Sequence, residues 1–167
     1  MYLPPDRIFA LLDVPEGGVV IDFGAGTGVF TIQLATRRPD VRVIALDEQA
    51  EMLKLLQSKP AARALPNIQP LLVEHIGSLE QAADRILAIN VLHEIDDDAL
   101  RGMSRLLKPS GFILIVDWSA TADRPVGPPK HHTHSPSEAL SRLKNAGFEA
   151  TALESLPYHF VLLAHSK

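Results

Sequence analysis

The stretch VVIDFGAGTG at residues 19–28 decides the fold of this chain. A short apolar run leads directly into a loop that has glycine at every second position. Glycine permits positive φ in a tight turn, and it removes the side chains that would hold a small molecule away from main-chain N–H groups. Asp22 places a carboxylate where the predicted strand ends. We therefore expect this loop to bind a ligand.

Apolar runs and helical stretches alternate from here to the end of the chain. Near-continuous apolar segments, typical of a sheet covered on both faces, predict strands at 19–23, 41–46, 68–73, 85–89 and 112–118. A 3.6-residue period between them predicts three helix faces: Val29, Ile32 and Ala35; Met52, Leu53 and Leu56; and Leu100, Met103, Leu106 and Leu107. The alternation predicts βαβ units and a parallel sheet between helices.

The C-terminal third predicts how the sheet ends. Ser135-Pro136-Ser137-Glu138 has the residues of a capping box, so a helix is expected over 135–146 with Gly147 as its C-terminal cap. Apolar runs at 148–153 and 158–164 follow, and the short connection between them requires an antiparallel hairpin. The predicted fold class is α/β: a three-layer sandwich with a Rossmann-like, seven-stranded, mostly parallel sheet and an antiparallel C-terminal hairpin.

Composition narrows the class of protein further. The 167 residues are about the length of one domain, so we expect a single domain over 1–167. No apolar run approaches the roughly 20 residues that span a bilayer, and the N-terminus does not resemble a signal peptide, so a cytoplasmic location is expected. The net charge is −4 and the basic residues are scattered, which makes nucleic acid an unlikely partner. The absence of cysteine excludes disulfides, thiolate metal sites and thiol nucleophiles.

The glycine spacing separates two classes of nucleotide-like cofactor. A dinucleotide fingerprint, G-x-G-x-x-G/A, would place its last small residue at Val29, whereas Gly28 gives the pattern D-x-G-x-G-x-G. Asp47, at the end of the next apolar run, can accept two hydrogen bonds from a ribose diol. The alternatives are a glycine-rich turn that binds no ligand, a dinucleotide site, and an Asp47 that only caps the helix starting near Gln49.

With Asp22 and Asp47, the loop resembles the cofactor loop of class I S-adenosylmethionine-dependent methyltransferases. The stretch DRILAINVLHEI at 84–95 resembles the fourth-strand motif of that family, and LLKPSG at 106–111 resembles the turn before the fifth strand. The segment GPP at 127–129, the capped helix, and the residues at 147–148 and 156–159 resemble a small subgroup that includes ubiquinone and menaquinone biosynthesis enzymes. The similarity spans nearly the whole chain.

The resemblance implies S-adenosylmethionine as cofactor and S-adenosylhomocysteine as product. The glycine loop would hold the methionine end, Asp47 and Glu48 the ribose, and the segment after the third strand the adenine. The implied cofactor-binding residues are Asp22, Phe23, Gly24, Ala25, Gly26, Thr27, Gly28, Asp47, Glu48, Glu74, His75 and Asn90. The chain departs from the family pattern at two places. In the subgroup a basic residue usually follows the histidine after Gly-Pro-Pro, whereas here Thr133 follows His132. The segment EHIG at 74–77, which would flank the adenine, is also atypical of the family. Arsenite methylation, which some relatives perform through several cysteines, is excluded.

Methyl transfer from a sulfonium is a direct displacement, so most of the acceleration can come from positioning. A general base is needed only if the acceptor must lose a proton. His93, after the fourth predicted strand, is the candidate catalytic residue; the alternative is that it caps or packs. His131, His132 and His134 have poor spacing for a metal site, so no metal is expected, and 119–134 is predicted to be a loop over the substrate side.

These observations predict an S-adenosylmethionine-dependent methyltransferase that acts on a small-molecule acceptor. A non-catalytic S-adenosylmethionine-binding module or partner subunit is the alternative, and an NAD-dependent oxidoreductase is opposed by Val29. Only a helix near Pro5–Leu12 and one loop are available to cover the acceptor, so the pocket is either open or completed by a second subunit in a homodimer. The acceptor itself is not readable from the sequence.

Overall fold

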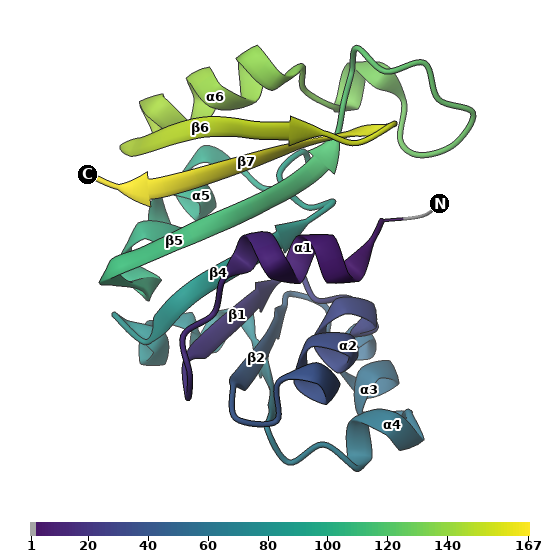
Figure 1. Ribbon diagram of the computed structural model, residues 1–167, viewed down its shortest axis with the longest axis vertical. Helices are drawn as coiled ribbons and strands as arrows, with labels where there is room; N and C mark the ends of the chain where they lie inside the picture. The colour runs from purple at the N-terminus through teal and green to yellow at the C-terminus, as the bar shows by residue number, and fades with distance from the viewer. Residues whose placement is uncertain (1–2) are drawn as a thin grey trace.

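The computed structural model describes residues 3–167, which form one sheet with helices against both faces (Figure 1). The strands are β1 (Val19–Phe23), β2 (Arg42–Asp47), β3 (Ile68–Leu72), β4 (Ala83–Ile89), β5 (Leu107–Trp118), β6 (Phe148–Ser155) and β7 (His159–Ser166). The helices are α1 (Pro5–Leu12), α2 (Val29–Arg37), α3 (Ala50–Ser58), α4 (Pro60–Arg63), α5 (Asp97–Leu106) and α6 (Pro136–Asn145), with 3-10 helices η1 (Val73–Leu79) and η2 (Lys130–His132). Within these residues, no helix has the length and apolar character needed to cross a membrane.

The strand order is β3-β2-β1-β4-β5-β7-β6. β1 to β5 pair in parallel, while β7 is antiparallel to both β5 and β6. This arrangement confirms the predicted seven-stranded, mostly parallel sheet with its C-terminal hairpin. From β1 the chain proceeds outward first to β2 and β3 and then, on the other side, to β4 and β5. Open α/β sheets bind ligands at the carboxyl ends of strands where the order reverses in this way.

Alternation along the strands explains why both faces are covered. In β1, Val20 packs with residues of α1 and α2, whereas Ile21 and Phe23 belong to the core on the opposite face, with residues of α5 and α6. β5 shows the same division, with Leu114 on the first face and Ile115 on the second. Strands buried on both faces need apolar residues at nearly every position, which is the pattern that predicted them.

Two local predictions were wrong. The face expected for α2 included Val29, which is 56% exposed; the buried residues of this helix are Thr31, Leu34 and Ala35. The predicted helical period is right, but the buried face of the helix is rotated toward Thr31, which contacts Asp22 near the end of β1. In the segment at 106–111, expected as a turn before β5, Leu106 ends α5 and the other residues belong to the strand. Ala83 pairs with Leu107 and Arg85 with Phe112, so the residues between these pairs form a bulge.

The prediction for α6 is confirmed. The Ser135 hydroxyl accepts a hydrogen bond from the Glu138 N–H, and the Glu138 carboxylate accepts one from the Ser135 N–H. The reciprocal pair satisfies two donors that the first turn of a helix leaves open. Gly147 ends the helix with φ +94°, a conformation that favours glycine.

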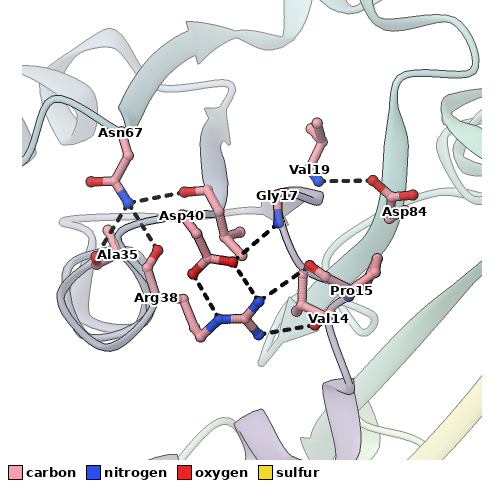
Figure 2. Close-up of polar contacts among 10 residues, drawn as sticks. Val14, Pro15, Gly17, Val19, Ala35, Arg38, Asp40, Asn67 and Asp84 are labelled. Atoms are coloured by element: carbon pink, nitrogen blue, oxygen red, sulfur yellow. Dashed lines mark hydrogen bonds and ion pairs between the residues drawn. The ribbon is translucent and has the colours of Figure 1, made fainter.

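Polar contacts hold the amino ends of the strands, on the side opposite to the glycine loop (Figure 2). The Arg38 guanidinium donates to the Asp40 carboxylate and to the carbonyl oxygens of Val14 and Pro15, at 2.7–3.2 Å. The Asn67 amide donates to three carbonyl oxygens around the end of α2, those of Ala35 and Arg38 at 3.2 Å and that of Val41 at 2.9 Å. These side chains fix the loops below the sheet and leave the other end free for function.

We expect Asn67→Ala to lower the free energy of unfolding by about 1–3 kcal/mol, because three carbonyl groups lose their side-chain donor. Chemical unfolding followed by circular dichroism measures the change. Asn67→Asp, which keeps the shape but has no donor at neutral pH, should cost at least as much. Gln57→Ala, at an exposed position of α3, is the matched control. A loss below about 0.5 kcal/mol for both Asn67 variants, the range of ordinary surface changes, would show that these hydrogen bonds are not stabilising.

Candidate functional site

A cavity of about 380 Å³ lies at the carboxyl ends of β1, β2 and β4. It is enclosed by the glycine loop after β1, the start of α3, the segment after β4 and the beginning of α5. Its lining residues are Phe23, Gly24, Gly26, Asp47, Glu48, Gln49, Met52, Val73, Asn90, Val91, Glu94, Ile95, Asp96 and Ala99. Helix α6 secures the segment after β4, because Arg142 donates to the Leu92 carbonyl oxygen at 2.7 Å.

The N–H groups of the glycine loop donate hydrogen bonds to other groups of the protein. The N–H groups of Gly24 and Ala25 both donate to the Leu46 carbonyl oxygen, at 2.9 and 3.0 Å, and that of Gly28 donates to Ala25 at 2.9 Å. The Gly26 N–H donates to the Asp47 carboxylate at 2.7 Å. The expectation that the loop offers its N–H groups to a ligand is therefore wrong for these four residues. A diphosphate, which depends on such donors, would find them occupied.

Asp22 occupies the amino end of α2 in place of a ligand. Its carboxylate is buried and accepts a hydrogen bond from the Thr31 hydroxyl at 2.5 Å. Burial raises the pKa of Asp22 to about 6, although hydrogen bonds from the side chain and backbone of Thr31 oppose the rise. A helix amino end attracts anions, and here a carboxylate of the protein itself fills that position. This arrangement further disfavours a dinucleotide.

The charges around the cavity all have one sign. Asp47, Glu48, Glu94 and Asp96 contribute carboxyl groups to the lining, and no lysine, arginine or histidine of residues 3–167 lines it. A concave surface with one sign of charge concentrates ligands of the opposite sign. The cavity is therefore suited to a cationic ligand. S-Adenosylmethionine carries an ammonium and a sulfonium group against a single carboxylate, which agrees with this field.

Two further features fit a ligand in this cavity. A Cβ atom at Gly26 would meet nothing within 4 Å, so glycine leaves open space beside the loop. The Asn90 Oδ1 atom is buried without a hydrogen-bond partner, and Asn90 has φ +56°. A non-glycine residue in the left-handed region is costly and is concentrated at functional sites. The group that would satisfy Asn90 is a donor bound in the cavity, such as a hydroxyl or an amino group.

The structure divides the predicted cofactor-binding residues into two groups. Those that line the cavity are Phe23, Gly24, Gly26, Asp47, Glu48 and Asn90, and those that lie outside its lining are Asp22, Ala25, Thr27, Gly28, Glu74 and His75. Some of the second group shape the loop: Gly28 packs against Leu56, and the Thr27 carbonyl oxygen accepts a hydrogen bond from Lys59 at 2.6 Å. Glu74 and His75 have exposed side chains in η1, and Val73 is the residue of that segment that reaches the cavity.

His93 is held beside the cavity by a buried carboxylate. Its Nδ1 lies 2.8 Å from Asp117 Oδ1, and its N–H donates to Asp117 Oδ2 at 3.0 Å. The other ring nitrogen, Nε2, is 3.8 Å from the carboxylate of Glu94, which lines the cavity. Burial alone would lower the pKa of His93, but the hydrogen bond and charge of Asp117, with Glu94, outweigh it and raise the pKa above its ordinary value.

Asp117 is the main residue that sequence reasoning missed. It is 1% exposed and lies near the end of β5, where it accepts hydrogen bonds from His93 and from the Trp118 N–H. The signal that could have found it is a carboxylate interrupting an apolar strand near its carboxyl end, as Asp22 and Asp47 do in β1 and β2. Glu94 and Asp96 were also missed, because acidic residues before a helix look like ordinary capping residues.

The segment from Ser119 to His134 begins next to Asp117 and contains η2. The Ala120 N–H donates to the His134 carbonyl oxygen at 2.9 Å, which closes the segment at its base. His131 and His132 are exposed, whereas His134 is partly buried. Within the described part of the chain, no group of three or more histidine, cysteine, aspartate or glutamate residues could hold a metal ion. Figure 1 shows this segment projecting on the side to which β5 points.

Comparison with known families agrees with the geometry. A family described as a methyltransferase domain matches residues 15–159. An uncharacterized methyltransferase of Mycobacterium tuberculosis is 34% identical over 124 residues, which are 72% of this chain and 47% of the relative. A trans-aconitate 2-methyltransferase of Azoarcus is 29% identical over 164 residues, which are 96% of this chain and 61% of the relative. The chain thus spans about half the length of its Mycobacterium relative, and other matches are named for RNA substrates.

Solved structures show the same fold. The crystal structure of an S-adenosylmethionine-dependent methyltransferase from Aquifex aeolicus superimposes with a TM-score of 0.87 and 26% sequence identity. The match covers 96% of this chain and 88% of the other. The fold of this chain is therefore one that an S-adenosylmethionine-dependent methyltransferase also has.

Gly26 and Gly28 separate the roles of the loop. Gly28→Ala should lower the free energy of unfolding by about 2–4 kcal/mol, because its Cβ would lie 2.2 Å from the buried Leu56 Cδ1 and its φ is +77°.

Gly26→Ala meets no such contact and should lower the free energy of unfolding by about 1 kcal/mol, but its methyl group would enter the cavity. We expect it to weaken S-adenosylmethionine binding at least about tenfold, measured by calorimetry. Equal affinity in Gly26→Ala and the unchanged protein would place the cofactor elsewhere.

Proposed function

The chain belongs to the S-adenosylmethionine-dependent methyltransferase family, and from this premise we propose that it transfers a methyl group from S-adenosylmethionine to a small-molecule acceptor. The observation that carries the proposal is the cavity at the carboxyl ends of β1, β2 and β4, with four acidic residues and no basic residue in its lining over residues 3–167. Such a field suits a sulfonium cofactor and opposes a dinucleotide diphosphate.

We assign the cofactor contacts to the residues that line this cavity. Asp47 accepts hydrogen bonds from Gly26 and Gln49, at 2.7 and 2.9 Å, and an ionised carboxylate keeps further lone pairs for ribose hydroxyls. Asn90 Oδ1 is available to accept a hydrogen bond from the ligand. Gly26 leaves room for the methionine end, while the absence of a side chain at Gly24 lets Val91 pack against the loop. Asp22 stabilises the loop indirectly, because its carboxylate accepts a hydrogen bond from Thr31 of α2. We assign it no contact with the cofactor.

When bound, S-adenosylmethionine supplies an electrophilic methyl group whose transfer disperses the positive charge on sulfur. The chain need only hold the acceptor in line and, for an acceptor with a hydroxyl group, receive its proton. Asp117 accepts the hydrogen bond from His93 Nδ1, which leaves Nε2 as the proton-accepting atom. His93 is therefore the proposed general base, and Asp117 is the residue that positions it.

A small-molecule acceptor agrees with several features of the chain. Its net charge is −4, and a surface that follows phosphates would need a basic cluster. The relative from Azoarcus, which aligns with nearly the whole chain, is named for a small organic acid. A second subunit that completes the acceptor pocket remains part of the proposal.

Thermal unfolding with three ligands tests the proposal first. S-Adenosylmethionine and S-adenosylhomocysteine should each raise the melting temperature in a concentration-dependent way, since both bind the folded state. NAD should not raise the melting temperature, and stabilisation by NAD alone would overturn the assignment.

The acceptor is then tested with methyl-labelled cofactor. A panel of small acceptors is screened, with tRNA and ribosomal RNA as the competing class. Transfer of label to RNA alone would show that the acceptor class is wrong.

The pH dependence of turnover tests His93. The raised pKa predicts that kcat falls as the pH drops through a value above 6.5, because protonated His93 cannot accept a proton. Asp117→Asn removes the largest contribution that raises this pKa, so the acidic limb should move to lower pH. The charged and titratable groups that act on His93 are Asp117 and Glu94, which raise its pKa, and Arg124, which lowers it; His134 lies nearby.

His93→Ala should lower kcat about 10²- to 10⁴-fold and remove the limb, while the affinity for the cofactor stays nearly unchanged. His165→Ala, at an exposed position of β7, is the control that should alter neither. The acceptor found in the screen is used for all variants. Unchanged turnover in His93→Ala would remove this residue from the mechanism.

A further inference from the structure

Buried polar atoms without partners gather at a second place in the fold. Within residues 3–167, the buried side-chain nitrogen and oxygen atoms that lack a hydrogen-bond partner are Asn90 Oδ1, Arg124 Nε, His134 Nδ1, Glu154 Oε1 and His159 Nε2. Asn90 belongs to the cofactor cavity, and Glu154 forms an ion pair with Arg7 through its other oxygen. The remaining three atoms are all nitrogens, and they lie around the end of β5.

Contacts around Trp118 connect these three residues. The His159 ring packs on the Trp118 ring with centroids 4.3 Å apart, and the Arg124 guanidinium lies over the same indole, 5.0 Å from its centroid. His134 pairs with Ser119, the residue after Trp118. The neighbouring carboxylate of Asp117 acts electrostatically on both His134 and His159. Arg124 and His159 therefore meet at Trp118, and His134 lies within electrostatic reach of the same Asp117 carboxylate; we call these three residues the Trp118 cluster.

Apart from the Asp117 carboxylate, whose oxygens already bind His93 and the Trp118 N–H, the polar groups of the cluster are complementary to an anion. Arg124 carries a permanent positive charge, and it forms no ion pair with a carboxylate of the described residues. Burial lowers the pKa of His159 to about 4, and burial with the charge of Arg142 lowers that of His134, so both imidazoles can donate hydrogen bonds as neutral rings. Buried polar groups normally find partners, and three in one cluster call for an oxygen-bearing ligand. The rings of Trp118 and His159, packed together beside these nitrogens, form a flat wall that favours a planar ligand at its edge.

We propose that Arg124, His134 and His159 form the acceptor subsite, and that they hold the carboxylate of a small planar hydroxy acid beside Trp118. This inference rests on the proposed methyl transfer and names the class of its acceptor. The acidic cofactor cavity repels such an acid, while Arg124 attracts it, so the two substrates are directed to different compartments. His93 links the cofactor cavity to the cluster, because its Nε2 lies 3.8 Å from Glu94 of the cavity lining and its Nδ1 lies 2.8 Å from Asp117.

The subsite also fixes how the reaction balances. The acceptor hydroxyl oxygen forms a bond to the methyl carbon, and the carbon–sulfur bond breaks with its electron pair remaining on sulfur. The hydroxyl proton passes to His93 Nε2, so the products are a methyl ether, S-adenosylhomocysteine and a protonated imidazole. Because the three nitrogens are covered in this structure, the segment between Ser119 and His134 must move to admit the acid.

Trp118 makes the proposal directly measurable, because it is the single tryptophan of the chain. Its fluorescence is titrated with benzoate, the planar acid used as probe, and with benzamide, its neutral isostere, without cofactor. Benzoate should change the signal saturably and bind at least about tenfold more tightly than benzamide. Arg124→Gln should weaken benzoate binding at least about tenfold. Arg42→Gln, at an exposed arginine at the far end of β2, should not change it.

His159→Phe gives a second and independent variant, since it keeps a ring against Trp118 but removes the nitrogen. It should weaken benzoate binding several-fold while leaving S-adenosylmethionine affinity, measured by calorimetry, unchanged. Equal binding of benzoate and benzamide, or unaltered benzoate affinity in both variants, would overturn the subsite. Failure of the unchanged protein to bind S-adenosylmethionine would instead count against the proposed function, so the two failures are distinguishable.

Discussion

The hydrogen bond from the Gly26 N–H to the Asp47 carboxylate, 2.7 Å long, joins the two strand ends on which the site depends. It holds the glycine loop against the end of β2, and the same carboxylate fixes the start of α3 through the Gln49 N–H. The Leu46 carbonyl oxygen binds two more N–H groups of the loop. A loop tied in this way is rigid and has few donors left for an anion. Gly26 therefore supplies space for a ligand rather than an N–H group, while Gly24 and Gly28 make room for Val91 and Leu56. The ligand that suits the acidic cavity beside this loop is a cation.

The distribution of charge divides the rest of the sheet's carboxyl edge into two regions. Over residues 3–167, the cofactor cavity has only acidic groups among its charged lining residues. Within the same residues, the cluster around Trp118 contains Arg124 and two histidines, each with one ring nitrogen that has no hydrogen-bond partner. The buried Asp117 lies where these regions meet and holds His93 in place. The proposed reaction between a cationic donor and an acidic acceptor uses this separation, because each substrate is drawn to the region whose charge is opposite to its own. The fold provides it by ending β4 and β5 side by side.

The sequence predicted the fold well, because strands buried on both faces must be apolar throughout and glycine, proline and capping residues mark the turns. The register of α2 was wrong, since Thr31 is polar yet buried by its contact with Asp22, a contact that no periodicity reveals. The site was predicted in part: Asp47, Gly26 and Asn90 line the cavity, whereas Glu74 and His75 lie outside it. Asp117 and His159 could not be linked to His93 beforehand, because strand pairing between β4, β5 and β7 brings them together.

The central claim is that a carboxylate at position 47 both anchors the glycine loop and draws a cationic cofactor into the cavity. Calorimetric titration of S-adenosylmethionine into the unchanged protein and into Asp47→Asn tests it most directly. The amide carries no charge and keeps an oxygen for only one of the two N–H donors, those of Gly26 and Gln49. We therefore expect at least about a tenfold loss of affinity together with a modest fall in melting temperature, because one N–H group loses its acceptor. Unchanged affinity in a folded Asp47→Asn protein would contradict it.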